Sequence, residues 1–585
     1  MAYCRRPSAA SCRRALSAPS RSLSAALAPP RPPPPRAVSL VASRLISSSP
    51  RPATANVALP HTHQHQQQPA TPPPPPSNRP YENRTTAELM NSLLVFRLCG
   101  MPWLVKSSGD LLELAEKLRL DPIAYAVVKR TFFKHFCGGE NLEEVVPTMQ
   151  TFKKAHVGSI LDLALEADVD EASLTGPAAH EQCKKVAKMF RDSIDIASQT
   201  HGSFIAVKIT ALLPVSILLS WSNTILLLQK AFNDAKPDKD GKVAIDKLPA
   251  TIGAIFPGLA GDAGKKLFKQ ADRDGDGRVD WIDMTDTFSL YNDTASRTLV
   301  RPQLVPKTPD NPLVTVEDLD TVKLLRPDID GVGQHAKEKK VRIMVDAEQT
   351  YFQPAIDDVG LNLCKLFNNP LADGVAADPN TVHGPLIYNT YQLYLRDAYP
   401  RMVMDVVRAQ RNKYAFGVKI VRGAYMHSER ERATEIGISD PIQPTIAATH
   451  AAYNAAIDHL IGKIEPGRPE RPLAFVVASH NANSIRHARQ EMKKRGIPPT
   501  ERAVAFAQLM GMQDGTTHGL AAAGHQVFKY IPYGPIAVTI PYLQRRALEN
   551  ADVLSGEGGI AQDRAEIRKE LALRFGRSPP PAATA

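Results

Sequence analysis

Short apolar runs alternate with longer amphipathic stretches along most of the chain. Six runs have the length and composition of buried parallel strands, at 204–209, 341–345, 417–421, 473–478, 503–507 and 526–531. The stretches between them have helical periodicity. This alternation of strand and helix predicts an α/β fold with a parallel sheet, either open or closed into a barrel.

Polar residues lie near the C-terminal ends of these runs, and they help to decide between an open sheet and a closed barrel. They are Lys208, Asp346, Arg422, His480, Gln508 and Tyr530. In a (β/α)8 barrel the active site is built at that end of the strands. An open doubly wound sheet would carry a Gly-rich first turn, and no convincing GxGxxG follows a strand. The pattern therefore favours a (β/α)8 TIM-type barrel, and it leaves the eighth strand unplaced.

Two further stretches are predicted to be helical. Residues 84–200 have apolar residues at helical spacing after a capping box at Thr85 and Glu88, so we expect a helical N-terminal region without substrate chemistry. The stretch 211–228 is the one candidate membrane span. It contains Pro214 and several Ser, Thr and Asn residues, so we interpret it as a packed helix.

The distance between the first two strands indicates an insertion. From Lys208 to Asp346 is 138 residues, whereas a plain strand–helix unit needs about 30–40. We therefore predict a barrel over 204–555 that is interrupted by a helical insertion at 230–295. Residues 556–585 are expected to form a C-terminal helix and a disordered tail.

The insertion contains the pattern of an EF-hand calcium loop. Its candidate metal ligands, at positions 1, 3, 5, 7, 9 and 12, are Asp272, Asp274, Asp276, Arg278 (through its carbonyl), Asp280 and Asp283. Asp283 stands where Glu would bind bidentately, which weakens Ca²⁺ and shifts the site toward Mg²⁺. An earlier copy has Lys236 and Lys247 at positions 1 and 12, so we expect it to be a metal-free structural partner. A loop without any ion is the alternative.

Charge and cysteine content restrict the class of protein. The chain has 585 residues and a formal net charge of +11. Residues 1–80 hold ten Arg and no acidic residue, so the rest of the chain sums to about +1. This location of the charge excludes a simple nucleic-acid binder. Six Cys without a CxxC motif exclude a disulfide scaffold and suggest no zinc site.

The basic N-terminal segment is typical of a mitochondrial transit peptide. Arginines are spaced through a Ser- and Ala-rich stretch that lacks the apolar run of a secretory signal. A Pro-rich stretch follows up to Pro80, so we predict that 1–80 is a transit peptide and a disordered linker.

Seven motifs resemble the proline dehydrogenase family, a group of mitochondrial flavoenzymes. They are FIAVKI (204–209), VDAEQT (345–350), YQLYLRDA (391–398), VKIVRGAYM (418–426), ASHN (478–481), AQLMGM (507–512) and KYIPYGP…PYLQRRALEN (529–550). They occur in the order of the family over about 340 residues. An inserted EF-hand pair is shared by only some eukaryotic members.

The resemblance implies a chemistry and a set of residues. The reaction would be oxidation of L-proline to 1-pyrroline-5-carboxylate, with hydride transfer from proline C5 to flavin N5 of FAD. The predicted substrate-site residues are Lys208, Asp346, Tyr425, Tyr530, Arg545 and Arg546. The predicted FAD-binding residues are Gln392, Lys419, Arg422, Thr449, His480, Asn481 and Glu549. The proton acceptor is left open between Lys208 and water.

The resemblance also implies partners and a location. Electrons would pass to a quinone of the respiratory chain, with peripheral association at the matrix side of the inner mitochondrial membrane. Two alternatives stay open. One is a hydroxyproline dehydrogenase, and the other is a calcium-responsive interaction protein built on an inactive barrel.

Overall fold

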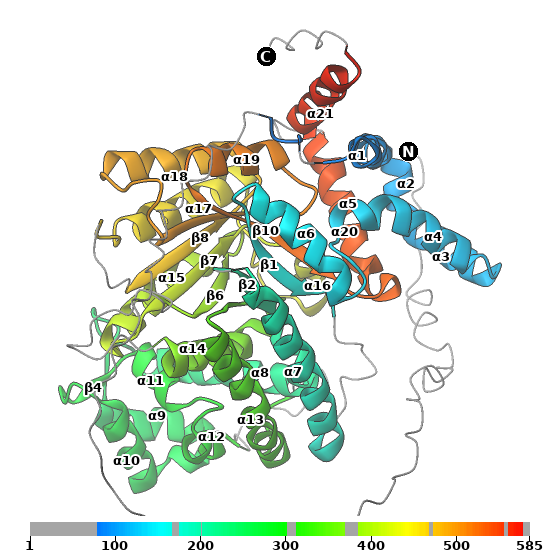
Figure 1. Cartoon of the computed structure of the whole chain (residues 1–585). Helices are drawn as coiled ribbons and strands as arrows, with labels where there is room; N and C mark the ends of the chain where they lie inside the picture. Colours follow the sequence, from blue (N-terminus) through cyan, green and yellow to red (C-terminus); the bar gives the residue numbers. More distant parts are fainter. Residues whose placement is uncertain are drawn as a thin grey trace, which may run out of the picture. The chain divides into compact units, whose positions relative to one another are not determined.

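The computed structural model describes residues 79–82, 84–165, 175–200, 202–300, 312–368, 384–466, 472–554 and 560–576. Eight of the described strands close into a parallel barrel (Figure 1). In chain order they are β1 (Gly158–Leu163), β2 (Phe204–Val207), β5 (Arg342–Val345), β6 (Ile387–Gln392), β7 (Phe416–Val421), β8 (Leu473–Ala478), β9 (Val504–Leu509) and β10 (Gln526–Tyr533). The barrel closes where β1 pairs with β10. The predicted barrel fold is therefore confirmed.

Helices follow the strands and surround the barrel (Figure 1). The helix α7 (Gly176–Ser198) follows β1, and both α8 (Val215–Asp234) and α13 (Val316–Lys339) follow β2. After the remaining strands come α14 (Gln353–Phe367), α15 (Ala398–Arg411), α16 (Met426–Ile436), α17 (Ile446–Ile461), α18 (Ala482–Lys494), α19 (Asp514–Ala522) and α20 (Ile536–Leu554).

Two barrel strands, β1 and β6, escaped the sequence pattern. The strand β1 lies within 84–200, so the prediction that this whole region is helical is wrong, and the barrel begins at Gly158 rather than Phe204. Its inward-facing Asp162 interrupts the apolar run, and in β6 polar residues occupy both faces. A search for apolar runs finds neither strand, because the polar side chains are buried and paired rather than solvated.

The barrel interior is a packed layer of side chains. It contains Ile160, Phe204, Ala206, Met344, Tyr388, Ala474, Val476, Ala503, Ala505, Ala507 and Phe528. Small alanines on β8 and β9 face large rings, with Phe204 lying 5.0 Å from Phe528 and 5.2 Å from Tyr388 between ring centroids. The filled interior means that a ligand has to bind above this layer, at the mouth of the barrel.

Helices precede and follow the barrel in the chain. The N-terminal ones are α1 (Thr86–Cys99), α2 (Pro102–Lys106), α3 (Ser108–Lys117), α4 (Asp121–Val128), the π-helix η2 (Lys129–Phe133), α5 (Lys134–Phe136) and α6 (Leu142–Lys154). The predicted capping box at Thr85 and Glu88 is present. The C-terminal helix α21 (Ile560–Arg574) meets this region, because Tyr81 donates a hydrogen bond to Asp563 at 3.0 Å.

The insertion forms a helical module with one short sheet. It contains β3 (Val243–Ala244), α9 (Leu248–Ile255), α10 (Gly261–Ala271), β4 (Arg278–Val279), α11 (Trp281–Thr287) and α12 (Asp293–Ser296). Short 3₁₀ turns are η4 (Ile209–Ala211), η5 (Ile245–Lys247), η6 (Pro257–Leu259) and η7 (Arg297–Leu299). Val243 pairs antiparallel with Val279, which joins the eighth positions of the two predicted EF-hand loops.

The apolar helix α8 agrees with its interpretation as a packed helix. It is the one helix, in the part of the chain that the structure describes, that is long and apolar enough to cross a membrane. However, 56% of its apolar window is buried in the protein. Trp221 is completely buried and donates a hydrogen bond to Asp358 at 2.9 Å.

A buried glutamate clamps the end of β2 to the end of β5. Both carboxylate oxygens of Glu348 accept hydrogen bonds from Thr210 Oγ1 at 2.9 Å. Burial raises the pKa of Glu348 to about 7, although Thr210 and Lys208 counteract the shift. The folded protein therefore keeps this proton at pH values where the unfolded chain has released it.

We predict that Glu348 makes the stability of the protein pH-dependent. Its contribution is complete below the unfolded pKa of 4.5 and is lost as the pH rises toward 7. At 1.36 kcal/mol per pKa unit, the loss is on the order of 3 kcal/mol. Glu348→Gln should remove this part of the pH dependence in urea unfolding between pH 4 and 8. The exposed control Glu435→Gln should keep it, and equal slopes in the two variants would refute the assignment.

Candidate active site

A cavity of about 520 Å³ opens at the carboxyl ends of the barrel strands. Side chains from every one of the eight strands or from the loops after them line it, together with helix α20. Of the predicted substrate and cofactor residues, those that line it are Lys208, Asp346, Gln392, Lys419, Arg422, Tyr425, His480, Asn481, Tyr530, Arg545, Arg546 and Glu549. The structure thus brings twelve positions from distant parts of the sequence to one cavity.

Four buried charges form an alternating row inside this cavity. Lys208 Nζ lies 2.5 Å from Asp162 Oδ1 and 3.9 Å from Asp346 Oδ2. Lys419 Nζ donates to Asp346 Oδ1, and the hydroxyl of Tyr530 donates to Asp346 Oδ2 at 2.7 Å. Each ion in the row has an oppositely charged neighbour, which offsets the cost of removing it from water.

The row stabilises the charged forms of Lys208 and Asp346, whereas burial outweighs the attraction of Lys208 at Asp162 and raises the pKa of that carboxyl. Burial alone would lower the pKa of Lys208, but the carboxylates of Asp162 and Asp346 outweigh burial and raise this pKa well above its usual range. For Asp346, burial is outweighed by Lys419 and Lys208, so its pKa is lowered. Burial raises the pKa of the Tyr530 hydroxyl, and the nearby Asp162 and Asp346 raise it further. Lys208 is therefore a cation and Tyr530 a neutral donor at physiological pH.

Helix α20 places two adjacent arginines over the cavity. Arg546 is 6% exposed, and its Nη2 donates to Glu549 Oε1 at 2.5 Å. Its guanidinium stacks over the ring of Tyr542, 5.0 Å from the centroid. The Nε atom of Arg546 and the hydroxyl of Tyr542 are buried with no hydrogen-bond partner among the described residues. These unpaired donors are suited to an acidic ligand group, which a buried arginine strongly favours.

Residues at the ends of β7 and β8 build another part of the cavity wall. Arg422 donates to Ser479 Oγ at 2.8 Å and to Ser484 Oγ at 2.9 Å. Nε2 of His480 accepts a hydrogen bond from the backbone N–H of Leu509 at 3.0 Å, so the ring proton is on Nδ1. Burial, with the nearby cations, lowers the pKa of His480 to about 3. The imidazole is therefore neutral and offers one N–H donor.

One predicted cofactor residue lies outside the cavity lining. Thr449 is the fourth residue of α17, and its hydroxyl donates to the carbonyl of Thr445 at 3.4 Å. The next residue, His450, lines the cavity and accepts a hydrogen bond from Arg422 Nε at 3.1 Å. The assignment of Thr449 stays a prediction without support from this geometry.

Sequence reasoning missed several lining residues. Asp162 and Tyr542 were not predicted, and Gln508 was noted only as a strand-end residue. Asp162 alternates with outward-facing Leu161 and Leu163 on β1, and this period-two pattern was the signal that could have revealed it.

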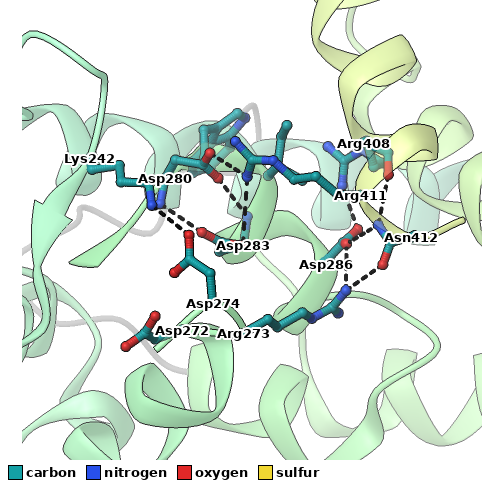
Figure 2. Close-up of polar contacts among 12 residues, drawn as sticks. Lys242, Asp272, Arg273, Asp274, Asp280, Asp283, Asp286, Arg408, Arg411 and Asn412 are labelled. Carbon is teal, nitrogen blue, oxygen red and sulfur yellow. Dashed lines mark hydrogen bonds and ion pairs between the residues drawn. The ribbon is translucent and has the colours of Figure 1, made fainter. Parts of the chain in front are cut away.

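The predicted metal loop is brought together only in part. Carboxylate oxygens of Asp272, Asp274 and Asp276 lie within 4.8 Å of one another. Figure 2 shows Lys242 reaching toward this group, with its Nζ 2.8 Å from Asp274 and 2.5 Å from Asp276. The ammonium group of Lys242 therefore opposes the mutual repulsion of these carboxylates.

The carboxylates at positions 9 and 12 have other partners. Asp280 and Asp283 cap α11, because each side chain accepts a hydrogen bond from the backbone N–H of the other. Arg411 of α15 also pairs with Asp280 at 2.6 Å. Arg278 pairs with Asp238 of the partner loop at 2.7 Å. The loop carboxylates that converge are thus those at positions 1, 3 and 5, and the assignment of the other three positions stays a prediction.

Sequence comparisons give the family of the chain. The proline dehydrogenase family profile matches residues 145–556. The chain is 32% identical over 538 residues to "Proline dehydrogenase 1, mitochondrial" of Homo sapiens, covering 81% of this chain and 86% of the relative. It is 32% identical over 555 residues to the Caenorhabditis elegans protein of the same name, covering 85% and 87%. It is 30% identical over 480 residues to "Hydroxyproline dehydrogenase" of Bos taurus, covering 81% and 88%.

Among solved structures, the chain is similar to proline utilization A (PutA) from Bdellovibrio bacteriovorus inactivated by N-propargylglycine. The TM-score is 0.49 at 18% sequence identity, and the match covers 86% of this chain and 41% of the other. The family profile covers the whole barrel from just before β1 to the end of α20. The chain therefore belongs to the proline dehydrogenase family.

Proposed function

We propose that the protein oxidises L-proline to 1-pyrroline-5-carboxylate with FAD, the first step of proline catabolism to glutamate. The observation that carries this proposal is the cavity, whose lining has five cations (Lys208, Lys419, Arg422, Arg545 and Arg546) and three carboxylates (Asp162, Asp346 and Glu549). Such an excess of positive charge suits a substrate carboxylate and the phosphates of a dinucleotide. Two buried donors on α20, Arg546 Nε and the Tyr542 hydroxyl, have no hydrogen-bond partner among the described residues.

The substrate carboxylate would be bound by the cations at one end of the cavity. Arg546 has an unpaired Nε, Arg545 is its neighbour on α20, and Lys208 is held as a cation by its two carboxylates. Tyr530 is fixed by its hydrogen bond to Asp346, so its ring forms a rigid wall beside the substrate. Positioning of this kind can supply a large share of the catalysis, because the substrate loses its translational and rotational freedom on binding and not in the reaction step.

The remaining lining residues would hold the cofactor. FAD, when bound, accepts the hydride that proline loses from C5. Gln392, Lys419, Arg422, His480, Asn481 and Glu549 are the residues that would contact it. Lys419 and Arg422 favour negative charge at this wall, and the Nδ1–H of His480 is available as a neutral donor.

Lys208 does not fit the role of proton acceptor. Its raised pKa keeps the amine protonated, since two buried carboxylates surround it. Its role is therefore to bind the carboxylate, and of the two candidates considered, water fits the proton-accepting step.

We predict that Arg546→Met loses turnover but keeps the cofactor. The purified wild-type protein should be yellow, and proline should bleach the colour. Loss of the buried guanidinium should cost on the order of 2–5 kcal/mol in kcat/KM for proline. The exposed arginine of α21 gives a matched control, Arg568→Met, which should behave as the wild type.

Three outcomes separate the alternatives. Unchanged kcat/KM in Arg546→Met would refute the carboxylate assignment. Equal bleaching by proline and 4-hydroxyproline would favour a hydroxyproline dehydrogenase, because we expect the fixed ring of Tyr530 to crowd a substituent on the substrate ring. Protein that holds no flavin would favour an interaction protein on an inactive barrel.

We also propose a mitochondrial location, with peripheral association at the matrix side of the inner membrane and a quinone as electron acceptor. Membrane association is supported by an apolar surface on the hairpin of α3 and α4, two helices in which no residue is buried. Its exposed side chains are Leu111, Leu114, Leu118, Leu120, Ile123 and Val127, and Trp103 on α2 is 64% exposed beside Lys106. Apolar residues with an aromatic and cationic border are typical of helices at a lipid interface. The root of this hairpin lies beside the active-site helix, since a Cβ on Gly109 would be 3.7 Å from Gln544 of α20.

We predict that changing the hairpin releases the protein from lipid. Wild-type protein should float with vesicles that contain anionic phospholipid, whereas the double variant Leu114→Glu, Leu118→Glu should stay in solution. Leu226→Glu, on the exposed side of α8, is the control and should still float. If Leu226→Glu stays in solution and the hairpin variant floats with the vesicles, then α8 and not the hairpin contacts the membrane.

We propose one divalent cation, Ca²⁺ or Mg²⁺, at Asp272, Asp274 and Asp276. These three carboxylates converge, although Lys242 now pairs with two of them. Asp280 and Asp283 would join only if Arg411 gives up its present contacts, and the carbonyl of Arg278 would be a further ligand. The partner loop, with Lys236 and Lys247, would bind none. The contacts of the loop with the barrel fall on the C-terminal residues of α15, at the end opposite to the active site. A stabilising role is therefore favoured over regulation at the cavity mouth.

We predict that calorimetric titration of metal-free protein finds one equivalent. Asp274→Asn should remove it, whereas Asp240→Asn in the partner loop should not. Ligand at 100 times its Kd should raise the free energy of unfolding by about 2.7 kcal/mol, with little change in proline turnover. Two equivalents or none would contradict the stoichiometry, and a large change in turnover would indicate that the cation regulates activity.

A further inference from the structure

The strand β6 turns buried polar groups toward the surrounding helices. Many outward-facing residues of the other strands, such as Ile205, Ile343, Val418 and Phe475, belong instead to the large apolar core. On β6, Asn389 and Tyr391 alternate with the inward-facing Tyr388, Thr390 and Gln392. Asn389 is 1% exposed and donates to Asp357 of α14 at 3.0 Å.

A buried chain of polar contacts leads from this face to the insertion. The hydroxyl of Tyr391 donates to Asp405 of α15 at 2.8 Å, and Asp405 accepts from Arg408 at 3.0 Å. Arg408 in turn donates to Asp286 of α11 at 2.6 Å and to Thr285 at 2.8 Å. The exposed fractions of Tyr391, Asp405 and Arg408 are 0%, 1% and 4%.

Asp286 is the point where this chain meets the predicted metal loop. Figure 2 shows it between Arg408 and Asn412 of the barrel and Arg273 of the loop. Asn412 donates to it at 2.8 Å and Arg273 at 3.1 Å. The insertion is therefore anchored on α15 by charged groups rather than by an apolar contact alone.

Burial of such a chain of polar contacts adds little to the stability of the fold, so we look for another structural role. A buried ion pair is often no better than apolar residues of the same volume, but it can select one arrangement over others. Strands need this selection, because a slip of one residue turns every side chain to the opposite face. The hydroxyl of Tyr391 has its buried partner only when Tyr391 points outward, and this orientation turns Gln392 toward the cavity.

The C-terminal end of β6, at the cavity, has few backbone contacts to hold it on the side of β5. Its pairing with β5 consists of Ile343 with Ile387 and Met344 with Tyr388, and it stops four residues before Gln392. On the other side, β7 pairs with β6 up to Gln392 itself. One edge of the strand at the flavin wall is therefore held by side chains instead of a continuous backbone ladder.

We propose that Tyr391, Asp405 and Arg408, together with Asp286 of the insertion, are positioning residues for the cofactor site. They hold the C-terminal end of β6 so that Gln392 faces the cavity, where its Nε2 also donates to the carbonyl of Glu348 at 2.6 Å. The effect on FAD binding rests on the proposed function. The effect of the buried polar contacts on the conformation of β6 is independent of that function.

The test compares two buried tyrosines of the same region. Tyr391→Phe removes the hydroxyl that bonds Asp405. Tyr414→Phe removes a hydroxyl that is buried with no hydrogen-bond partner among the described residues. Amide hydrogen exchange is measured on flavin-free protein, followed by the dissociation constant of FAD and by kcat and KM for proline.

We expect Tyr391→Phe to raise exchange in residues 388–395 about tenfold while β8 keeps its wild-type protection. FAD should bind about tenfold more weakly, and combining Tyr391→Phe with Gln392→Ala should add little to either single change. Arg408→Lys should recover part of the protection that Arg408→Met loses. Tyr414→Phe should match the wild type in all these measurements.

Several results would overturn the proposal. One is wild-type exchange in β6 of Tyr391→Phe, and another is an equal rise throughout the barrel, which indicates general destabilisation. Wild-type FAD affinity with raised exchange in β6 would also refute positioning of the cofactor site. Because exchange is measured without flavin or proline, failure of the proposed oxidation would leave this part of the test intact.

Discussion

The row of charges from Asp162 through Lys208 and Asp346 to Lys419 is the interaction on which the mouth of the barrel depends. Its members come from β1, β2, β5 and β7 or from the residues directly after them. An unpaired ion at such a buried position costs several kcal/mol. Removing Lys208 would take from Asp162 its partner in the row, and removing Asp346 would do the same to Lys419. The row is complete without a ligand, and the cavity is therefore organised before substrate binds.

The same row strengthens a short seam of the sheet. The strands β1 and β2 pair over only three residues, ending at Asp162 and Ala206. The ion pair of Asp162 with Lys208 continues this contact beyond the last backbone pair. The seam between β1 and β2 and the cavity thus share one contact, which explains why a strand outside the recognised motifs contributes a central residue.

Local pattern predicted most strands and missed two for the same physical reason. Apolar runs revealed six strands, whereas β1 and β6 bury Asp162, Asn389 and Tyr391, whose partners belong to other elements of the fold. The residues that line the cavity were predicted mainly by family resemblance, since a single arginine or tyrosine has no local signature. The predicted metal loop shows the same limit. Its spacing predicted the convergence of Asp272, Asp274 and Asp276, but not the pairing of Asp280 with Arg411, which is 131 residues away by number.

The two ends of the insertion lie close together, so it can be accommodated with little distortion of the barrel. The chain leaves α8 and returns beside it, because Thr224 Oγ1 accepts a hydrogen bond from the backbone N–H of Val314 at 3.0 Å. An insertion whose ends meet adds little strain to the crossover between β2 and β5, and the entropic cost of a longer loop grows only slowly with its length. Mere tolerance of the insertion would thus need no further contact with the barrel. The buried contact of Asp286 with Arg408 is such a further contact, made on α15 rather than on the crossover itself. Since desolvating these groups is costly, their presence indicates a constraint that the module places on β6, in addition to its own folding.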